Sequence, residues 1–379
     1  MSQATPARIL IINPFGIGDV LFTTPLVRAM RRAFPKSRID YLCNRRTERV
    51  LRDNPHLNDL LVYEKDELDR LLKGSWWQGL RYIGRLLRRV TDARYEYVVD
   101  LSLGERYSFI LKVLGVPRRV GFDFRRRGRF LTERLPIDGY QSDHVVEHYR
   151  RLLLFLGIRL LEESLELPLS DEDHAWSERY LQEHGLRDAP LLVGIAPAGG
   201  VSWGIDAPFR RWSLEGFAVV ADALIEQHGA RVLLFGEVAD TPICQKVARL
   251  MKHPVIDVSG RTTLGQFVSL LSRLSLVVCN DGGPLHLAVS QRVKTVSIFG
   301  PVDPAVYGPY PLQRQEHEVV CRRDLPCRPC YHQFKLPPCP YERACLKTVE
   351  PQEVIAACLR LLTAQRSGVV GASSSSLRN

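Results

Sequence analysis

A carboxylate follows two glycines directly after an apolar segment near the start of the chain, in the run Asn-Pro-Phe-Gly-Ile-Gly-Asp that ends at Asp19. Glycines in such a turn let the backbone come close to a ligand. The third glycine of a dinucleotide-binding fingerprint is missing, and the negative charge of Asp19 would repel a pyrophosphate placed on this turn. A carboxylate at the mouth of a sheet suits proton abstraction, so Asp19 is a candidate general base. The alternative is that Asp19 only caps a helix.

A denser cluster lies in the second half of the chain, in the run VVCNDGGPLHLA that starts at Val277. The pattern predicts a strand that ends at Asn280, a glycine turn, and a helix for which Pro284 suits the first turn. The N–H groups at the start of that helix would form an anion site, and a diphosphate is its natural occupant. The alternative for the histidine is that it only satisfies the helix end. The candidate residues of this anion-binding loop are Asp281, Gly282, Gly283 and His286.

A second anion-binding element is predicted earlier in the same half. Gly199 and Gly200 follow an apolar segment and supply approachable backbone, and Arg210 stands between them and the next predicted helix. An arginine can clamp phosphate oxygens with two hydrogen bonds. The order of loop, basic side chain and helix favours a phosphate site more than any of the three features does alone.

The elements that position these residues alternate between strand and helix, which favours parallel sheets covered on both faces. The pattern weakens in the polar stretch 157–173 and then begins again. Two Rossmann-like α/β halves joined by a linker fit this order, and the carboxyl ends of their strands are expected to face a central cleft. The predicted strands are Arg8–Asn13, Arg38–Cys43, Tyr95–Leu101, Arg118–Phe122, Leu191–Ala196, Arg231–Gly236, Leu276–Asn280 and Thr295–Phe299, and the predicted helices include Asp19–Phe34, Arg106–Leu114, Ser142–Leu156 and Leu214–His228.

The composition excludes several classes of protein. The 379 residues are 45% hydrophobic and 25% charged, which gives room for about two domains and rules out a small disulfide-stapled fold. No apolar run approaches the roughly 18–20 residues of a membrane-spanning helix. The opening residues lack the basic head and cleavage site of a secretory signal, so we expect a cytoplasmic protein.

Positive charge is concentrated in one part of the first half. The formal net charge is +10, and the stretch from Arg81 to Arg134 holds 14 Lys and Arg against 6 Asp and Glu. This predicts an anionic partner, such as a membrane surface, a phosphorylated glycan or nucleic acid, unless the charges only form a solvated helix face. No zinc-finger, helix-turn-helix or aromatic nucleic-acid-binding pattern accompanies the charge, so we expect no nucleic acid.

Three runs together resemble glycosyltransferase family nine, the ADP-heptose:lipopolysaccharide heptosyltransferases, over about residues 8–365. They are FGIGDVLFTTPLVRAMRRAFP, RRWSLEGF and VVCNDGGPLHLAVSQRVKTVSIFGPVDP. The resemblance implies a GT-B fold, an inverting mechanism, a nucleotide-activated heptose as donor and Asp19 as general base. It also implies that Asp281, Gly282, Gly283 and His286 form the donor-binding loop, called the donor loop below. Arg210 stands where the family has a lysine that meets the diphosphate. A carboxylate for the nucleotide ribose is expected after Gly236, where Glu237 and Asp240 are both available.

The expected chemistry follows from these charges. Asp19 takes the proton of an acceptor hydroxyl, while Arg210, His286 and the helix amino terminus stabilise the departing diphosphate, so no cofactor is required for catalysis. The acceptor is expected to be a lipid-linked core saccharide at the inner membrane surface, which implies peripheral association with the cytoplasmic membrane. The candidate acceptor-site residues are Gly18, Arg45, Arg46, Arg125 and Arg126.

Two alternatives to this function stay open. The same fold could glycosylate a protein or another surface glycan, or carry a sugar other than heptose. It could also bind a nucleotide-sugar without turnover. An Asp19→Ala variant discriminates between these classes, because only an enzyme has transfer to lose.

Five of the nine cysteines fall within the segment 321–345. Disulfides are disfavoured in the cytoplasm, and Cys-Arg-Pro-Cys followed by two further thiols has the donor set of a tetrahedral metal site. A structural zinc or iron is therefore one hypothesis, and reduced thiols packed as small hydrophobic groups are the other. The candidate metal ligands are Cys327, Cys330, Cys339 and Cys345.

The expected domain organisation starts and ends with disorder. Residues 1–7 and the Ser/Gly-rich tail 367–379 are expected to be disordered. Residues 8–165 are expected to form an acceptor domain and 166–350 a nucleotide-sugar donor domain that includes the Cys-rich segment. A C-terminal helix is expected over 351–366.

Overall fold

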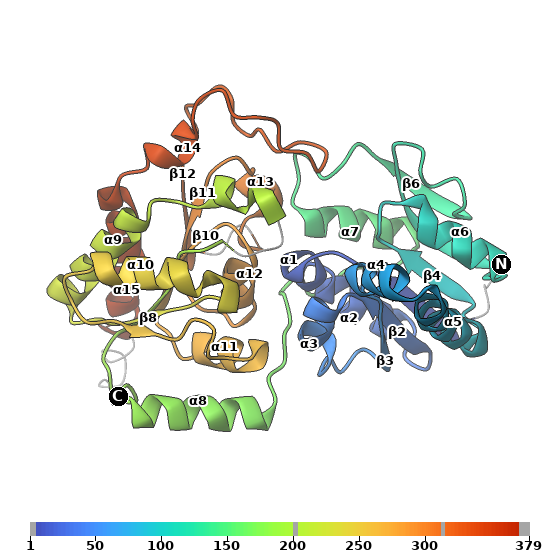
Figure 1. The fold of residues 1–379 in the computed structure, drawn as a ribbon, viewed down its shortest axis with the longest axis horizontal. Coiled ribbons are helices and arrows are strands. Elements are labelled where there is room, and N and C mark those ends of the chain that lie inside the picture. The colour runs from blue at the N-terminus through green and yellow to red at the C-terminus, as the bar shows by residue number, and fades with distance from the viewer. Residues whose placement is uncertain (1–4, 200–203, 312–314, 371–379) are drawn as a thin grey trace, which may run out of the picture. The chain divides into compact units, whose positions relative to one another are not determined.

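The computed structural model describes residues 5–199, 204–311 and 315–370. The chain divides between Pro168 and Leu169 into two compact units, each built on its own sheet (Figure 1). Residues 1–4 and 371–379, parts of the two segments expected to be disordered, lie outside the described residues. In the rest of the first segment, the Ala7 amide donates to Glu96 Oε2 at 2.8 Å.

The first unit contains a six-stranded sheet in the order β3-β2-β1-β4-β5-β6. Every neighbouring pair is parallel. This is the doubly wound strand order, in which the chain winds outward on one side of β1 and then on the other. Four of the five residues of β1 are buried, as expected for a central strand of a parallel sheet. The strands are β1 (Arg8–Ile12), β2 (Arg38–Cys43), β3 (Asp59–Val62), β4 (Tyr97–Asp100), β5 (Arg118–Phe124) and β6 (Glu133–Ile137).

Helices connect these strands. A core of β-strand side chains such as Leu10 and Val98 packs against Val90 of α5 and Leu111 of α6. Helices α2 and α7 pack against each other elsewhere in the unit. The helices are α1 (Ile17–Leu21), α2 (Thr24–Ala33), α3 (Arg45–Leu51), α4 (Lys65–Gly74), α5 (Trp76–Ala93), α6 (Glu105–Val113) and α7 (Val145–Phe155).

The single helix predicted for Asp19–Phe34 is wrong, because the structure breaks it between α1 and α2. Pro25 lies at the start of α2 and has no N–H to continue the hydrogen-bond ladder. The hydroxyls of Thr23 and Thr24 donate to the carbonyls of Val20 and Leu21, both at 2.7 Å. These side chains therefore satisfy carbonyl groups that an unbroken helix would have paired through its backbone.

The second unit repeats the strand order of the first. Its sheet runs β12-β11-β10-β7-β8-β9, and all neighbouring pairs are again parallel. The fold class is therefore confirmed as α/β, with two parallel sheets. The strands are β7 (Leu192–Ala196), β8 (Arg231–Leu234), β9 (Ile256–Asp257), β10 (Leu276–Asn280), β11 (Thr295–Phe299) and β12 (His317–Cys321).

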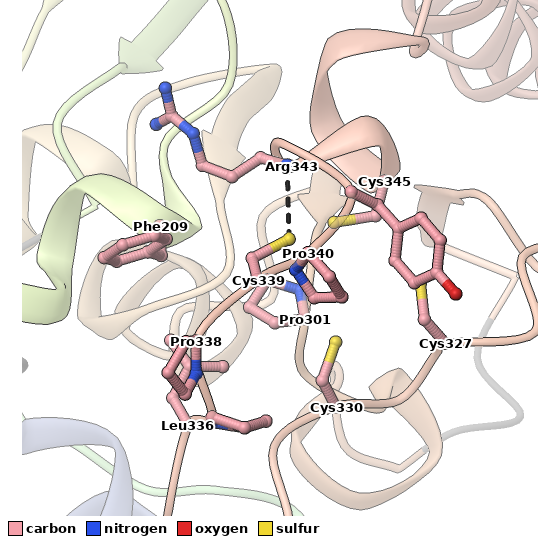
Figure 2. Close-up of a pocket in the computed structure, with 12 residues that line it drawn as sticks. Phe209, Pro301, Cys327, Cys330, Leu336, Pro338, Cys339, Pro340, Arg343 and Cys345 are labelled. Atoms are coloured by element: carbon pink, nitrogen blue, oxygen red, sulfur yellow. Dashed lines mark hydrogen bonds between the residues drawn. The ribbon is translucent and has the colours of Figure 1, made fainter.

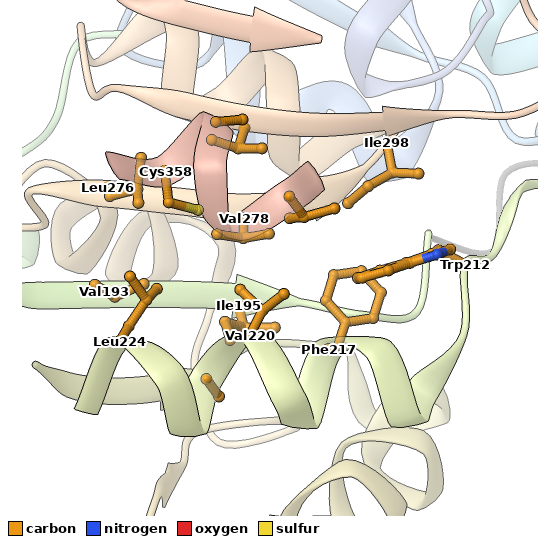
Figure 3. Close-up of a cluster of buried hydrophobic side chains, with 14 of the residues drawn as sticks. Val193, Ile195, Trp212, Phe217, Val220, Leu224, Leu276, Val278, Ile298 and Cys358 are labelled. Carbon is orange, nitrogen blue, oxygen red and sulfur yellow. The ribbon is translucent and has the colours of Figure 1, made fainter. Parts of the chain in front are cut away.

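The core of the second unit lies between its sheet and helices that include α9 and α15 (Figure 3). Trp212 packs edge-on to Phe217 with ring centroids 5.0 Å apart, and its indole N–H donates to the Val349 carbonyl at 3.0 Å. A Cβ on Gly216 would lie 2.5 Å from the Trp212 ring, so only glycine fits below the indole. This packing fixes the backbone that leads from Arg210 into α9.

Helices flank and connect the strands of the second unit, and α15 is the last of them. Helix α15 ends at Val370, beyond the end expected at residue 366, since an existing helix gains one hydrogen bond for each residue added. Over the described residues, no helix has the length and apolar character to cross a membrane. The helices are α8 (Asp171–Glu183), α9 (Leu214–His228), α10 (Thr241–Leu250), α11 (Leu264–Leu271), α12 (Gly283–Ser290), α13 (Pro304–Tyr307), α14 (Ala344–Lys347) and α15 (Pro351–Val370), with 3-10 turns η1 (Gly204–Arg210) and η2 (Val238–Asp240).

Candidate active site

The strand order places a topological switch point in each unit, between β1 and β4 and between β7 and β10. Ligands of doubly wound sheets bind outside the carboxyl ends of the strands at such points. The Asp19 loop follows β1, and the loops that hold Gly199 and Asp281 follow β7 and β10. Asp19, Gly199 and Asp281 thus lie at the switch point of their own unit.

The Asp19 loop is shaped by the side chain of Asn13. Asn13 Oδ1 accepts from the Phe15 amide at 3.1 Å, and Asn13 Nδ2 donates to the Asp19 carbonyl at 3.2 Å. Asp19 Oδ2 accepts from the Gly16 amide at 3.2 Å, which is the helix-capping contact raised as the alternative to a base. Asp19 is half-buried. The capping hydrogen bond orients the carboxylate of Asp19 within the loop.

Three buried tyrosines lie in the electrostatic field of Asp19. Burial raises the pKa of Tyr41, Tyr140 and Tyr149, and the Asp19 carboxylate adds to the rise in each case. The Tyr140 hydroxyl donates to the Tyr149 hydroxyl at 3.4 Å. These phenols therefore stay neutral near the Asp19 loop, where they are able to donate hydrogen bonds.

Asp100 is a second acidic group at this switch point, and the sequence analysis missed it. It ends β4 and pairs in register with Ile12 of β1. Its Oδ1 accepts from the Ser102 amide at 3.0 Å, whereas its buried Oδ2 has no hydrogen-bond partner within the described residues. Burial raises the pKa of Asp100 from 3.8 to about 6. The sequence signal for this residue is an acidic side chain at the end of the apolar run YVVD.

The basic residues expected to meet an acceptor also follow strand ends of the first unit. Arg45 and Arg46 are exposed at the start of α3, and Asn44 ties this helix to the Asp19 loop by donating to the carbonyls of Pro14 at 3.1 Å and Phe15 at 2.6 Å. Arg45 also contacts Glu67 at 3.3 Å. The structure thus brings these two arginines to the loop of the candidate base.

Arg125 and Arg126 lie farther along the same edge of the sheet. They follow β5, which β4 separates from β1. Both are exposed and have positive φ angles of 52° and 60°, and the Arg125 guanidinium lies over the Phe124 ring at 5.0 Å. Gly18 lies beside Asp19 in α1. The first-unit candidates therefore share one sheet edge, although the two arginine pairs follow different strands.

The second unit gathers three loops around the buried Asn280. Its Nδ2 donates to the Pro197 carbonyl at 2.7 Å, and its Oδ1 accepts from the Trp212 amide at 2.9 Å. A Cβ on Gly282 would lie 2.9 Å from the Gly199 carbonyl oxygen, so the glycines permit this close approach. Gly199 and the donor loop are thus brought together, while Gly200 lies outside the described residues.

Arg210 and Asp281 form a buried ion pair within this cluster. Arg210 Nε and Nη2 both approach Asp281 Oδ2, at 3.0 and 2.5 Å. Burial raises the pKa of Asp281, and Arg210 opposes that rise. Asp281 therefore fixes the guanidinium of Arg210 in place, which the sequence alone did not indicate.

Helix α12 begins directly after this ion pair. Gly282 is its N-cap residue and Pro284 lies in its first turn, as the pattern predicted. The positive end of the helix dipole consequently adjoins the Arg210 side chain. His286, in the same helix, is 4% exposed.

The two acidic residues after β8 differ in exposure. Glu237 is exposed, whereas Asp240 is buried and its Oδ2 accepts from the Glu237 amide at 3.2 Å. Burial raises the pKa of Asp240. The side chains of Glu237 and Asp240 cap each other's backbone in this turn, and Glu237 is the one exposed to solvent.

The four candidate metal-ligating cysteines line one cavity of about 150 Å³ in the second unit (Figure 2). Burial raises the pKa of Cys330, and it raises that of Cys345 to about 11, so both thiols are protonated at neutral pH. Cys339 Sγ accepts from the Arg343 amide at 3.3 Å. Four thiols suit zinc or iron by chemistry. In the part of the chain that the structure describes, however, no three His, Cys, Asp or Glu side chains are arranged to hold a metal ion.

Two doubly wound units of this kind, with candidate sites at their switch points, define a GT-B-like fold. The chain belongs to glycosyltransferase family 9 (heptosyltransferase), whose family model matches residues 83–339. It is therefore a glycosyltransferase, and the resemblance seen in its motifs is confirmed.

Named relatives agree with this assignment. The lipopolysaccharide core heptosyltransferase OpsX of Haemophilus influenzae is 21% identical over 309 residues, which cover 80% of this chain and 82% of the relative. The structure of a family 9 glycosyltransferase from Veillonella parvula matches with a TM-score of 0.79 and 25% identity, over 96% of this chain and 99% of the other. The E. coli ADP-heptose lps heptosyltransferase II matches with a TM-score of 0.72 and 21% identity, over 95% and 99% of the two chains.

Proposed function

We propose that this glycosyltransferase moves heptose from ADP-heptose to a lipopolysaccharide inner-core acceptor, with inversion at the anomeric carbon. The names of its relatives support the sugar, the nucleotide and the acceptor class. The observation that carries the proposal for the site is the cluster around Asn280, where Gly199, Gly282 and the ion-paired Arg210 meet at the start of α12.

The second unit is proposed to bind the donor. The diphosphate lies against Arg210, His286 and the amino terminus of α12, while the glycine backbone of the donor loop permits close approach. The buried carboxylate of Asp281 acts through Arg210, because its Oδ2 already accepts from that guanidinium. Glu237 binds the ribose hydroxyls, since it is exposed whereas Asp240 is buried.

The first unit is proposed to bind and activate the acceptor. Asp19 accepts the proton of an acceptor hydroxyl as that oxygen forms a bond to the anomeric carbon from the face opposite the nucleotide. The bond between the anomeric carbon and the diphosphate oxygen breaks, and its electron pair leaves with ADP. Arg210 and the α12 dipole stabilise the charge that develops on the leaving diphosphate.

The arginines of the first unit are proposed to recognise the anionic acceptor. Arg45, Arg46, Arg125 and Arg126 are exposed on the edge of the sheet that carries Asp19. Guanidinium groups bind the carboxylates and phosphates of an inner-core saccharide with paired hydrogen bonds. We place this reaction on the cytoplasmic face of the inner membrane, where a lipid-linked core saccharide is presented.

The test is transfer from a panel of nucleotide-sugars to defined lipid-core acceptors, with released nucleotide and glycosylated product both measured. We expect product from ADP-heptose, its loss in Asp19→Ala, and unchanged transfer in the control Asp171→Asn, which alters an exposed carboxylate at the start of α8. Nucleotide release without product would overturn the acceptor assignment. Transfer to a protein or from another sugar would favour the alternative functions.

A structural zinc or iron at the four-cysteine cavity is a separate proposal that rests on the thiols lining it. The transfer step does not depend on it. Elemental analysis of protein purified without chelator would compare the wild type with Cys327→Ser/Cys330→Ser. Equal metal content in the two proteins would refute the site.

A further inference from the structure

The helices α4 and α5 form a hairpin whose tip exposes large apolar side chains. Leu72, Trp76, Trp77 and Leu80 are 45%, 55%, 62% and 50% exposed. The two indoles stack on each other with centroids 4.0 Å apart and an interplanar angle of 29°. A cluster of exposed tryptophan and leucine in a protein of this kind indicates a contact surface rather than a packing defect. Residues 70–89 are called the lipid-contact hairpin below.

The inner face of the hairpin is already filled, so these side chains have no core to enter. Val90 is buried in the first unit's core and Leu86 packs against it. A Cβ on Gly79 would lie 2.4 Å from Leu72 Cδ2, so glycine allows α4 and α5 to pack closely at the tip. The Tyr82 hydroxyl also accepts from the Glu64 amide at 2.9 Å. The apolar tip is thus held in an exposed position by a packed base.

The segment at the tip carries only basic charge, and the acidic residues of α4 and α5 flank it at Asp66, Glu67, Asp69 and Asp92. The lipid-contact hairpin contains six Arg and Lys residues and no Asp or Glu. Arg88 and Arg89 are near acidic partners, Asp92 and Asp59. Within the described residues, the other four basic side chains of the hairpin have no acidic partner, and they are Arg70, Lys73, Arg81 and Arg85.

We propose that the lipid-contact hairpin docks this protein on an anionic lipid surface. Trp76 and Trp77 enter the interfacial region, where the amphipathic indole ring is favoured, and the unpaired basic side chains meet the lipid phosphates. The six basic side chains within residues 70–89 complement an anionic membrane. This surface adds to the proposed function, and it depends on neither the donor nor the transfer step.

The apolar contribution is tested by flotation of the full chain with vesicles of phosphatidylglycerol and phosphatidylcholine, without any sugar substrate. Wild type floats with these vesicles and not with phosphatidylcholine alone. Trp76→Ser/Trp77→Ser lowers the partition coefficient by about tenfold or more, because interfacial binding scales with buried apolar area. The matched control is Leu154→Ser/Phe155→Ser on α7, an adjacent apolar pair exposed by 49% and 48%. An equal loss in both variants, or no binding by the wild type, overturns the proposal.

The charge contribution is tested in the same assay. Arg81→Gln/Arg85→Gln weakens vesicle binding, and added salt weakens the wild type in the same direction, because screening shortens the reach of the charges. Lys246→Gln/Arg249→Gln on α10 removes equal charge from the other unit and leaves binding unchanged. Equal effects of the two charge variants would overturn the proposal.

Two further measurements distinguish lipid binding from failure of the proposed function and from a protein interface at the hairpin. Transfer to a delipidated, water-soluble acceptor should be the same in Trp76→Ser/Trp77→Ser as in the wild type. If the proposed function is wrong, neither protein transfers the sugar. Sedimentation velocity measures whether the tryptophan variant changes self-association. A protein that does not bind vesicles but dissociates upon this substitution has a protein interface at the hairpin, which contradicts the lipid assignment.

Discussion

The two units share one strand order but treat the acidic groups at their switch points differently. In the second unit, the carboxylate of Asp281 directly after the fourth strand is paired with the buried Arg210. In the first unit, Asp100 closes the corresponding strand, and its Oδ2 has no hydrogen bond within the described residues. Asp19 follows the first strand of that unit. Under the proposed function, the second unit binds the diphosphate next to Arg210 and the first unit removes the acceptor proton through Asp19.

The most severe test of this contrast is the removal of the candidate base. Asp19→Asn should lower kcat by about 10³-fold, because a positioned base contributes 10²- to 10⁴-fold, while the affinity for ADP-heptose stays unchanged. Steady-state transfer and titration calorimetry measure the two quantities. A parallel loss of donor affinity would show that Asp19 belongs to donor binding, and the contrast between the units would fail.

Breaking the ion pair should damage the second unit in two separable ways. Arg210→Ala leaves Asp281 buried without its cation, and we expect the free energy of unfolding to fall by about 3–5 kcal/mol together with a loss of donor affinity. Denaturant unfolding and calorimetry measure these effects. The double variant Arg210→Ala/Asp281→Ala should recover much of the stability but not the donor affinity. Recovery of both would mean that Arg210 has only a structural role.

The pH dependence of the free energy of unfolding tests the state of Asp100 in the first unit. Burial raises the pKa of Asp100 from 3.8 to about 6, so the folded protein holds this proton more tightly than the unfolded chain. Its contribution to stability is therefore present at low pH and lost as the pH rises from about 4 to about 6.

Asp100→Asn removes that titration. We expect the variant to be more stable than the wild type by about 3 kcal/mol at pH 7.5 and to lose this advantage near pH 4. Unfolding by urea at several pH values measures the difference. An advantage independent of pH, or a destabilised variant at pH 7.5, would contradict the buried, unpaired state of this carboxylate.

The smallest expected effect concerns the ribose. Glu237→Gln should raise the KM for ADP-heptose by about tenfold, since a hydrogen bond to a charged group is lost. Asp240→Ala should instead lower the melting temperature with little change in KM, because the turn loses the side-chain oxygen that accepts from the Glu237 amide. Initial-rate kinetics and thermal unfolding distinguish the two residues, and the reverse assignment would follow from the opposite result.

Much of the fold was predictable because local pattern and tertiary packing agree. Helix α9 and strands β2, β10 and β11 have the predicted bounds, since their apolar runs end at turn residues. The break before Pro25 was missed, although proline and two threonines signal it. For the α4–α5 hairpin, the sequence indicated only an excess of basic residues. A contact surface depends on which side chains the fold leaves exposed, and the sequence pattern does not give that.

The sequence predicted which loops form the candidate site, but it did not predict the contacts between them. Glycine and proline at fixed offsets from an apolar strand identify the donor loop after Asn280, because few other residues fit that turn. The hydrogen bonds of Asn280 to Pro197 and Trp212 join residues far apart in the chain, and no local pattern encodes them. The choice of Glu237 over Asp240 likewise needed their exposure.

The central claim is that Asp19 and the donor loop act on the same sugar. A crystal structure of Asp19→Asn with ADP-heptose and an inner-core acceptor tests it directly. The account predicts the diphosphate against Arg210 and the start of α12, and the acceptor hydroxyl within about 3 Å of the residue 19 side chain and in line with the anomeric carbon. A diphosphate bound elsewhere, or a residue 19 side chain turned away from the acceptor, would contradict it.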